Sequence, residues 1–191
     1  MKKETILFVV IALVIGVLIG VIVTNSRRDV PTSAPAAPPV AAPAVNQQQQ
    51  TTVLEEIVAR EPTNRNAWVR LGHNFFDANQ PMKAINAYAK ALELNDRDPD
   101  VLTDQGVMYR RVGWFDKAIS NFEKAHSLDQ NHRASLYNLG IVYRYDLQDF
   151  AKAKEVWTQF VAIDPGSPGS RQAQKELDFL QSHPQLQNKS Q

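Results

Sequence analysis

The chain has 191 residues, of which 43% are hydrophobic, and its 21 basic and 20 acidic side chains give a formal net charge of +1. This balance provides no overall field that would attract nucleic acid or an acidic substrate, so we expect no nucleic-acid partner. The chain has no cysteine. Disulfides, thiolate nucleophiles, cysteine-ligated zinc and iron–sulfur clusters are therefore excluded.

After a short tail at residues 1–4, the run Thr5 to Thr24 is uncharged. A helix of this length spans about 30 Å, the hydrocarbon thickness of a bilayer. A cleaved signal peptide would have a shorter apolar core and a cleavage site of small residues, which does not follow here. We predict a permanent single-pass transmembrane helix over residues 5–24. Gly16 and Gly20 form a G-x-x-x-G motif, which allows a homodimer through this helix, although glycine is common in such helices without one.

The charges that flank this run are nearly symmetrical. Lys2 and Lys3 precede it, whereas Arg27 and Arg28 follow it, and positive residues favour the cytoplasmic side. The very short tail with two lysines favours a cytoplasmic N-terminus, which leaves the rest of the chain in the periplasm of a bacterium. The two arginines leave the opposite orientation open, with a cytoplasmic body.

Residues 25–50 are rich in proline, alanine and glutamine. Proline removes backbone donors, and the small or polar residues between the prolines cannot build a core. A proline-rich chain extends by about 3 Å per residue, so the segment would reach about 60 Å. We predict a disordered linker that holds the body away from the membrane.

The body contains an internal repeat. Gly72, Gly106 and Gly140 are separated by 34 residues each. An aromatic residue follows each glycine by three positions, and an alanine followed after four residues by another aromatic recurs further on. The recurring residues are Phe75, Tyr109 and Tyr143, then Ala84, Ala118 and Ala153, then Tyr88, Phe122 and Trp157. The last two alanines are 35 residues apart, and we place the extra residue in the turn around Asp146 to Asp149.

This pattern resembles the tetratricopeptide repeat (TPR) family, whose 34-residue unit reads W-x2-L-G-x2-Y followed by A, F, A and P. The first copy has Trp68, Leu71 and Gly72, whereas the second has Gln105 where leucine is usual. The resemblance implies an all-α, right-handed solenoid of three helix-pair repeats with capping helices. The assigned segments are an N-terminal capping half-repeat at 51–64, repeats at 65–98, 99–132 and 133–167, a C-terminal capping helix at 168–183 and a disordered tail at 184–191.

We expect helices at 64–78, 81–94, 99–112, 115–128, 133–145, 149–163 and 168–182, and a first capping helix at Val53 to Arg60. Each helix pair needs its neighbours to bury its apolar face. The glycines should allow the first helix of a pair to lie close to the second, and the recurring aromatics should fill the core.

The motifs of catalysis and metal binding are missing from the sequence. No two histidines have the spacing of a zinc site. The run Asp96 to Asp100 opens like a calcium loop but lacks its glycine and its closing glutamate. There is no phosphate-binding glycine loop and no G-x-S-x-G. We therefore expect neither an enzyme nor a metal or cofactor site.

In TPR proteins the first helix of each pair lines the concave face, and the resemblance implies that a partner binds there. The candidate groove residues are Asn66, Arg70, His73, Asp77, Thr103, Arg110, Arg111, Tyr137, Asn138, Arg144 and Tyr145, with Val69, Phe76, Asp104, Val107 and Ile141 at neighbouring groove positions. Arg110 and Arg144 are 34 residues apart and should form a stripe. Arginine beside tyrosine suits recognition of a peptide backbone or a carboxylate, but the same side chains also keep an exposed helix face soluble.

We predict a membrane-anchored adaptor that binds a protein or peptide segment in its concave groove and supports assembly of an envelope complex. The stretches PDVLTDQGVMYRRVG and NLGIVY are similar to the TPR domains of cytochrome c maturation factors. Two alternatives therefore stay open: an accessory factor of cytochrome c maturation, and a structural membrane protein that self-associates.

Overall fold

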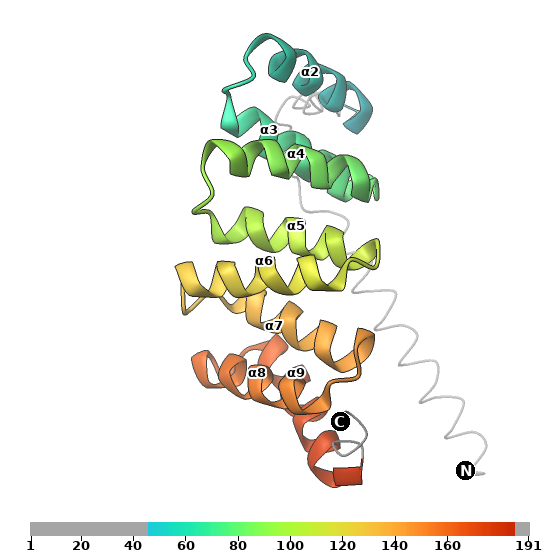
Figure 1. The fold of residues 1–191 in the computed structure, drawn as a ribbon, viewed down its shortest axis with the longest axis vertical. Helices are drawn as coiled ribbons and strands as arrows, with labels where there is room; N and C mark the ends of the chain where they lie inside the picture. The colour runs from blue at the N-terminus through green and yellow to red at the C-terminus, as the bar shows by residue number, and fades with distance from the viewer. Residues whose placement is uncertain (1–45, 186–191) are drawn as a thin grey trace, which may run out of the picture. The chain divides into compact units, whose positions relative to one another are not determined.

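A computed structural model describes residues 46–185, which form eight α-helices and one π-helical turn (Figure 1). These are α2 (Gln47–Arg60), α3 (Arg65–Asp77), α4 (Pro81–Leu94), α5 (Pro99–Arg111), α6 (Phe115–Leu128), α7 (Arg133–Ile141), η1 (Val142–Asp146), α8 (Phe150–Ile163) and α9 (Pro168–Ser182). The predicted transmembrane helix at 5–24, the linker up to residue 45 and the last six residues of the predicted tail lie outside the described residues. Within the described part, no helix is long and apolar enough to cross a bilayer.

When α7 and η1 are taken as one helix, the six repeat helices and the C-terminal capping helix lie where the repeat pattern predicts them, within one residue at each end. Local capping explains these boundaries, because the residue before a helix accepts a hydrogen bond from an otherwise unpaired backbone N–H. The side chains of Asn64, Asp98, His132, Asp149 and Ser167 cap α3, α5, α7, α8 and α9 in this way.

The N-terminal capping helix is longer than predicted. It begins at Gln47, so residues 47–50 belong to α2 and the predicted linker boundary at residue 50 was wrong. Glutamine is a good helix former, and the Asn46 side chain accepts a hydrogen bond from the Gln48 N–H at 3.2 Å. Thr51 is buried and donates its hydroxyl to the Gln47 carbonyl at 2.9 Å. Packing of this first turn therefore extends the helix into the glutamine run.

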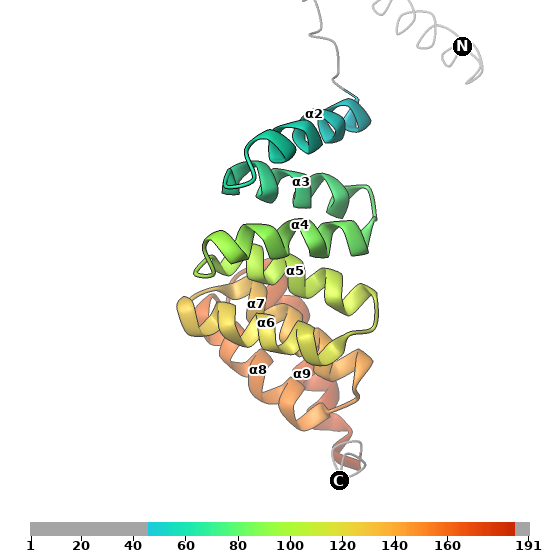
Figure 2. The same cartoon turned by 45° about the horizontal axis from the view of Figure 1, so that its top comes forward.

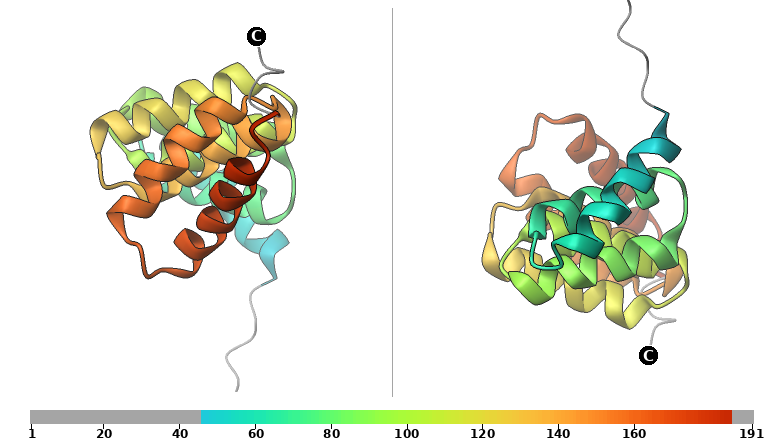
Figure 3. Two further views of the ribbon diagram at one scale, coloured as in Figure 1. Left: turned by 90° about the horizontal axis from the view of Figure 1, so that it is seen from below. Right: turned by 90° about the horizontal axis from the view of Figure 1, so that it is seen from above.

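The helices form a single stack, in which each helix packs on the next one along the chain (Figures 1 and 2). In addition, α3 contacts α5 and α5 contacts α7. The first helices of the three pairs therefore form an inner row, and α4, α6 and α8 form an outer row. The end-on views of Figure 3 show that successive helices turn around the axis of the stack instead of lying in one flat layer.

The glycines are required by close approach of the paired helices, as predicted. A Cβ atom added at Gly72, Gly106 or Gly140 would lie under 3.0 Å from ring atoms of Tyr88, Phe122 or Trp157, respectively. Real Cβ atoms essentially never come so close. Each of these rings is almost fully buried. The recurring glycine and the recurring aromatic are therefore two halves of one contact between the helices of a pair.

The extra residue of the third repeat lies in a helix and not in the following turn. The turns at 78–80, 112–114 and 147–149 each have three residues, and each has a positive φ at its middle residue. The helix before the third turn instead ends in η1, where the Leu147 N–H donates to the Val142 carbonyl at 3.0 Å. A π-turn absorbs one inserted residue without breaking the helix. The predicted insertion in the turn is therefore corrected to the end of the first helix.

Candidate functional site

Four of the predicted groove residues share one exposed face of α3. Asn66, Arg70, His73 and Asp77 all have exposed side chains, and their spacing of three or four residues places them on one side of a helix. His73 contacts Asp104 of α5, so this face of α3 lies on the same side of the stack as the neighbouring inner-row helix α5. The predicted face is therefore accessible on the first repeat.

His73 and Asp104 of the inner row form a small polar cluster with Tyr88 of α4. The distance between His73 Nε2 and Asp104 Oδ2 is 3.1 Å, and the Tyr88 hydroxyl donates to the same carboxylate at 3.4 Å. The hydrogen bond to Asp104 raises the pKa of His73 above its ordinary value of 6.5, against the opposite effect of partial burial. Burial, followed by the charge of Asp104, raises the pKa of Tyr88. Protonation of His73 turns its contact with the Asp104 carboxylate into an ion pair.

The predicted stripe of Arg110 and Arg144 is occupied by contacts between repeats. Arg110 forms a two-point ion pair with Asp146 of the following repeat. Arg144 donates to Glu176 of α9 at 3.2 Å, and its side chain is only 15% exposed. Its guanidinium carbon also lies 5.1–5.2 Å from the ring centroids of Tyr145, Phe150 and Phe179. Both arginines hold neighbouring units together, so they are poor candidates for binding a partner.

Thr103 does not line the groove, which corrects that prediction. It is 4% exposed, and its hydroxyl lies 3.5 Å from His132 Nδ1, because α5 turns this residue towards the next repeat. Tyr137 is half-buried, with its ring 5.3 Å from that of Phe160. Asn138 uses its amide to donate to the carbonyl of the preceding helical turn at 2.8 Å.

Arg111 and Tyr145 are the accessible candidates on the second and third repeats. The Arg111 guanidinium lies 4.7 Å from the Phe76 ring centroid and donates to the Asn79 side chain at 3.1 Å. Tyr145 is 51% exposed, and one edge of its ring packs on Trp157. With Arg70 and Asp77, these two residues leave charge and one aromatic face available on the inner row.

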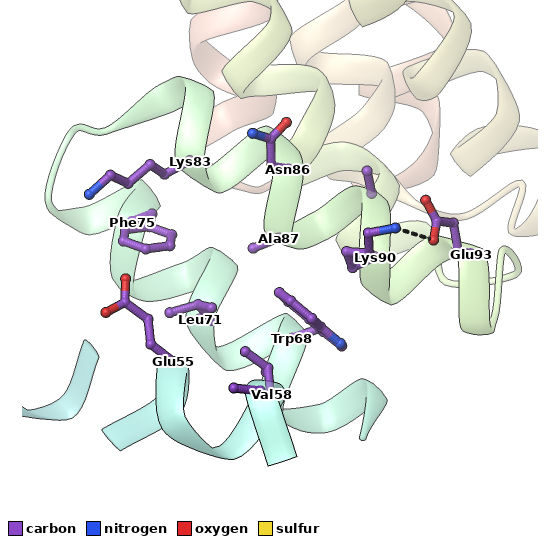
Figure 4. Close-up of a pocket in the computed structure, with 12 residues that line it drawn as sticks. Glu55, Val58, Trp68, Leu71, Phe75, Lys83, Asn86, Ala87, Lys90 and Glu93 are labelled. Atoms are coloured by element: carbon purple, nitrogen blue, oxygen red, sulfur yellow. Dashed lines mark hydrogen bonds and ion pairs between the residues drawn. The ribbon is translucent and has the colours of Figure 1, made fainter. Parts of the chain in front are cut away.

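A separate hollow of about 690 Å³ opens between α2 and α4, which both pack on α3 (Figure 4). Its lining is mostly apolar, with charged side chains at the rim. The lining residues are Glu55, Val58, Ala59, Trp68, Leu71, Phe75, Lys83, Asn86, Ala87, Ala89, Lys90 and Glu93. None of the groove candidates lines this hollow, and the repeat pattern alone had assigned Trp68, Leu71 and Phe75 to the core.

Within residues 46–185, no group of three or more histidine, aspartate or glutamate side chains is arranged to hold a metal ion. The arrangement that the described residues do offer is a set of exposed charged and aromatic groups on the inner row and an apolar hollow on the outer row. Both are surfaces suited to another polypeptide.

Comparison with known sequences agrees with the repeat pattern. Family profiles described as "Tetratricopeptide repeat" match residues 66–98, 99–132 and 134–167, which together make up more than half of the chain. The "Photosystem I assembly protein Ycf3" of Synechococcus sp. (strain CC9605) is 29% identical over 100 residues, covering 44% of this chain and 58% of that protein. The "Heat-shock protein cognate (HSC) co-chaperone sgt12" of Aspergillus fumigatus is 27% identical over 132 residues, covering 69% of this chain and 38% of that protein. The chain thus matches only part of the length of these relatives.

Known structures have the same fold. The "Crystal structure of MamA" superimposes with a TM-score of 0.68 at 19% identity, covering 75% of this chain and 82% of that one. The structure described as "YrrB: a TPR protein with an unusual peptide-binding site" superimposes with a TM-score of 0.63 at 25% identity, covering 68% of this chain and 66% of that one.

Proposed function

Because the chain belongs to the tetratricopeptide repeat family, whose members bind protein or peptide partners, we propose that it is a membrane-anchored adaptor. Its inner row of helices binds a segment of a partner protein and so supports assembly of a larger envelope complex. The anchor is the uncharged run at residues 5–24, and the repeats lie on the periplasmic side. The alternative orientation has the repeats in the cytoplasm.

One observation carries this proposal: the inner row presents accessible charged and aromatic side chains, two of which form no ion pair within the described residues. Arg70 and Asp77 are exposed and form no ion pair within residues 46–185. Arg111 and Tyr145 are exposed at the corresponding ends of the later helices. Arginine and tyrosine contribute strongly to binding energy at protein interfaces, whereas the internally paired Arg110 and Arg144 maintain the shape of the surface.

The relatives support the same class of function. The Ycf3 protein is described as an assembly protein, the sgt12 protein as a co-chaperone and YrrB as having a peptide-binding site. Each of these descriptions involves contact with another polypeptide. We transfer this general property to the chain as part of the proposal and transfer none of their particular partners.

Site-specific photocrosslinking in native membranes tests the groove. A crosslinking amino acid at Asn138 on the inner row should yield a discrete partner adduct, whereas the same group at Glu123 on the exposed side of α6 should not. The triple variant Arg70→Ala, Arg111→Ala and Tyr145→Ala should reduce the Asn138 adduct at least tenfold at a temperature at which circular dichroism shows the variant to be folded. An adduct of undiminished yield in the triple variant would remove the inner row as the binding surface.

The anchor and its orientation are tested separately. If residues 5–24 span the membrane, alkaline carbonate should leave the full chain in the membrane pellet. Protease added to intact spheroplasts should then cut the linker if the repeats are periplasmic and leave it intact if they are cytoplasmic. Release of the chain by carbonate would contradict the anchor without affecting the groove proposal.

A further inference from the structure

The hollow between α2 and α4 lies beside Ala87, a position at which the later repeats have larger side chains. Ala87 of the first repeat corresponds to Asn121 in the second and to Val156 in the third. Asn121 donates to Gln105 at 2.8 Å and to the Leu102 carbonyl at 3.1 Å. These bonds hold the Asn121 side chain of α6 against α5 of the same helix pair.

The third repeat fills the same position with an apolar side chain, since Val156 is 8% exposed and belongs to the core. In the first repeat, the small side chains of Ala59 on α2 and Ala87 on α4 are among those that line the two sides of the hollow. The rings of Trp68 and Phe75 therefore face an open space of about 690 Å³. This volume lies within the range of about 300–1,000 Å³ that is typical of clefts for small molecules.

We infer that this hollow is a second docking site, which receives one amphipathic α-helix of a partner protein. The lining consists of side chains from three helices, and it offers no sheet edge that could pair with a backbone. An extended peptide on this apolar floor would lose hydration of its N–H and C=O groups without replacement. A helix satisfies these groups internally and presents leucine-like side chains every third or fourth residue, which is the usual form of recognition in a groove.

The charges at the rim determine what the occupying helix carries beside its apolar stripe. Figure 4 shows Glu55 of α2 and Lys83 of α4 on opposite sides of the Phe75 end of the hollow. The Lys83 ammonium lies 5.2 Å from the Phe75 ring centroid, and neither Glu55 nor Lys83 forms an ion pair within residues 46–185. At the other end, Lys90 is already paired with Glu93 at 2.8 Å. The complementary helix therefore has a basic residue facing Glu55 and an acidic residue facing Lys83.

Designed peptides test this inference on the full chain reconstituted in lipid nanodiscs, with empty discs measuring peptide that binds lipid. Three labelled helical peptides share one leucine stripe and differ only in their flanks, which are mixed Glu/Lys, all Glu or all Lys. The wild-type chain should bind the mixed peptide about two- to fivefold more tightly than either of the others, as expected for exposed charge pairs. Glu55→Lys should shift the preference to the all-Glu peptide, and Lys83→Glu should shift it to the all-Lys peptide.

Filling the hollow should weaken binding of all three peptides, whatever charges flank their leucine stripe. Ala87→Val copies the residue of the third repeat, and Ala59→Leu fills the space from an exposed position of α2, so that at least one variant should keep the fold. Each folded variant should weaken all three peptides at least tenfold. The triple variant of the inner row should leave peptide binding unchanged, which separates this inference from the proposed function.

Three results of the peptide experiments would overturn the inference. They are equal affinity for the three peptides, undiminished binding to a folded hollow-filling variant, and no binding above that of empty discs. Self-association of the chain that Ala59→Leu abolishes, without peptide binding, would assign the hollow to a second copy and also overturn it.

Discussion

At the scale of single residues, contacts that recur with the repeat maintain the fold, whereas contacts that differ between repeats distinguish its surfaces. The glycine at each helix crossing is accounted for by one buried ring opposite it. The polar cluster around His73 has no equivalent set of residues in the other repeats. The position that Asp104 occupies in the second repeat is held by Arg70 in the first repeat and by Asn138 in the third. Residues of the first kind should control stability, and residues of the second kind should control recognition.

Gly106→Ala should destabilise the fold although alanine is the better helix former. The new Cβ would overlap the buried Phe122 ring, and overpacking of this kind costs about 1–3 kcal/mol. The gain in helix propensity is about 1 kcal/mol, so we expect a net loss of up to about 2 kcal/mol in the free energy of unfolding by urea denaturation. Gly166→Ala is the matched control, since nothing lies within 4 Å of its added Cβ. Equal stability of the two variants would contradict the close-approach explanation.

The pair of His73 and Asp104 should stabilise the fold more at low pH. Since the pKa of His73 is raised in the folded state, its stabilising effect is complete below its unfolded value of about 6.5 and is lost as pH rises through the folded pKa. The difference in melting temperature between wild type and His73→Gln should therefore be larger at pH 6 than at pH 9. Asp104→Asn should return the pKa of His73 towards 6.5 in an NMR titration, and an unchanged titration would refute the assignment.

Replacement of Arg144 should destabilise the fold, whereas replacement of Arg70 should leave its stability nearly unchanged. Arg144→Ala removes three ring contacts and leaves Glu176, which is only 18% exposed, without its cation. Loss of one partner from such a pair costs about 1–3 kcal/mol, measurable by chemical denaturation. Arg70→Ala removes an exposed side chain and should change stability by less than about 0.5 kcal/mol. A neutral effect of Arg144→Ala would return this arginine to the set of binding residues.

At the scale of elements, the two departures from the predicted helices have local physical causes. Helix α2 starts early because a capping asparagine and a buried threonine stabilise its first turn. The helix formed by α7 and η1 accommodates an extra residue because one π-turn widens it while the following turn keeps its length. In both places the length or winding of the helix differs from the prediction, whereas the packing of the helix on its neighbours is as the repeat pattern predicts.

Asn46→Ala should loosen the start of α2. The loss of a capping side chain costs about 1 kcal/mol, so hydrogen exchange of the amides at residues 48–52 should accelerate about fivefold. Gln50→Ala exchanges one good helix former for another and should leave exchange nearly unchanged. If residues 47–50 were a linker, neither substitution would alter their exchange.

At the scale of the whole molecule, the body is a linear stack in which each unit is held by its neighbours. The ion pair between Arg110 and Asp146 connects the second repeat to the third, whereas the pairs Arg65–Asp98 and Arg133–Asp164 join the two ends of the first and of the third repeat. The terminal helices complete the apolar surfaces at the two ends, and Ala173 and Leu180 of α9 are fully buried against the last repeat. Removal of a terminal unit should therefore destabilise the unit next to it most and the more distant units less.

Truncation of the chain after Pro165 removes α9 and the Glu176 partner of Arg144. Hydrogen exchange should then show a loss of protection in α7 and α8, while α3 and α4 retain theirs, because the units interact mainly with their neighbours. Uniform loss of protection along the stack would show that the body unfolds as one cooperative unit instead.

The repeat period in the sequence determined which segments are helices, how they pair and which residues form the core between them. These properties depend on local helix propensity and on a residue pattern that occurs three times in the chain, between Gly72 and Trp157. The tertiary structure decided which exposed candidates are free, since Arg144 meets Glu176 only because α9 folds back on η1. It also decided that Ala87 leaves a hollow, because the size of that space depends on side chains of three different helices that only packing brings together.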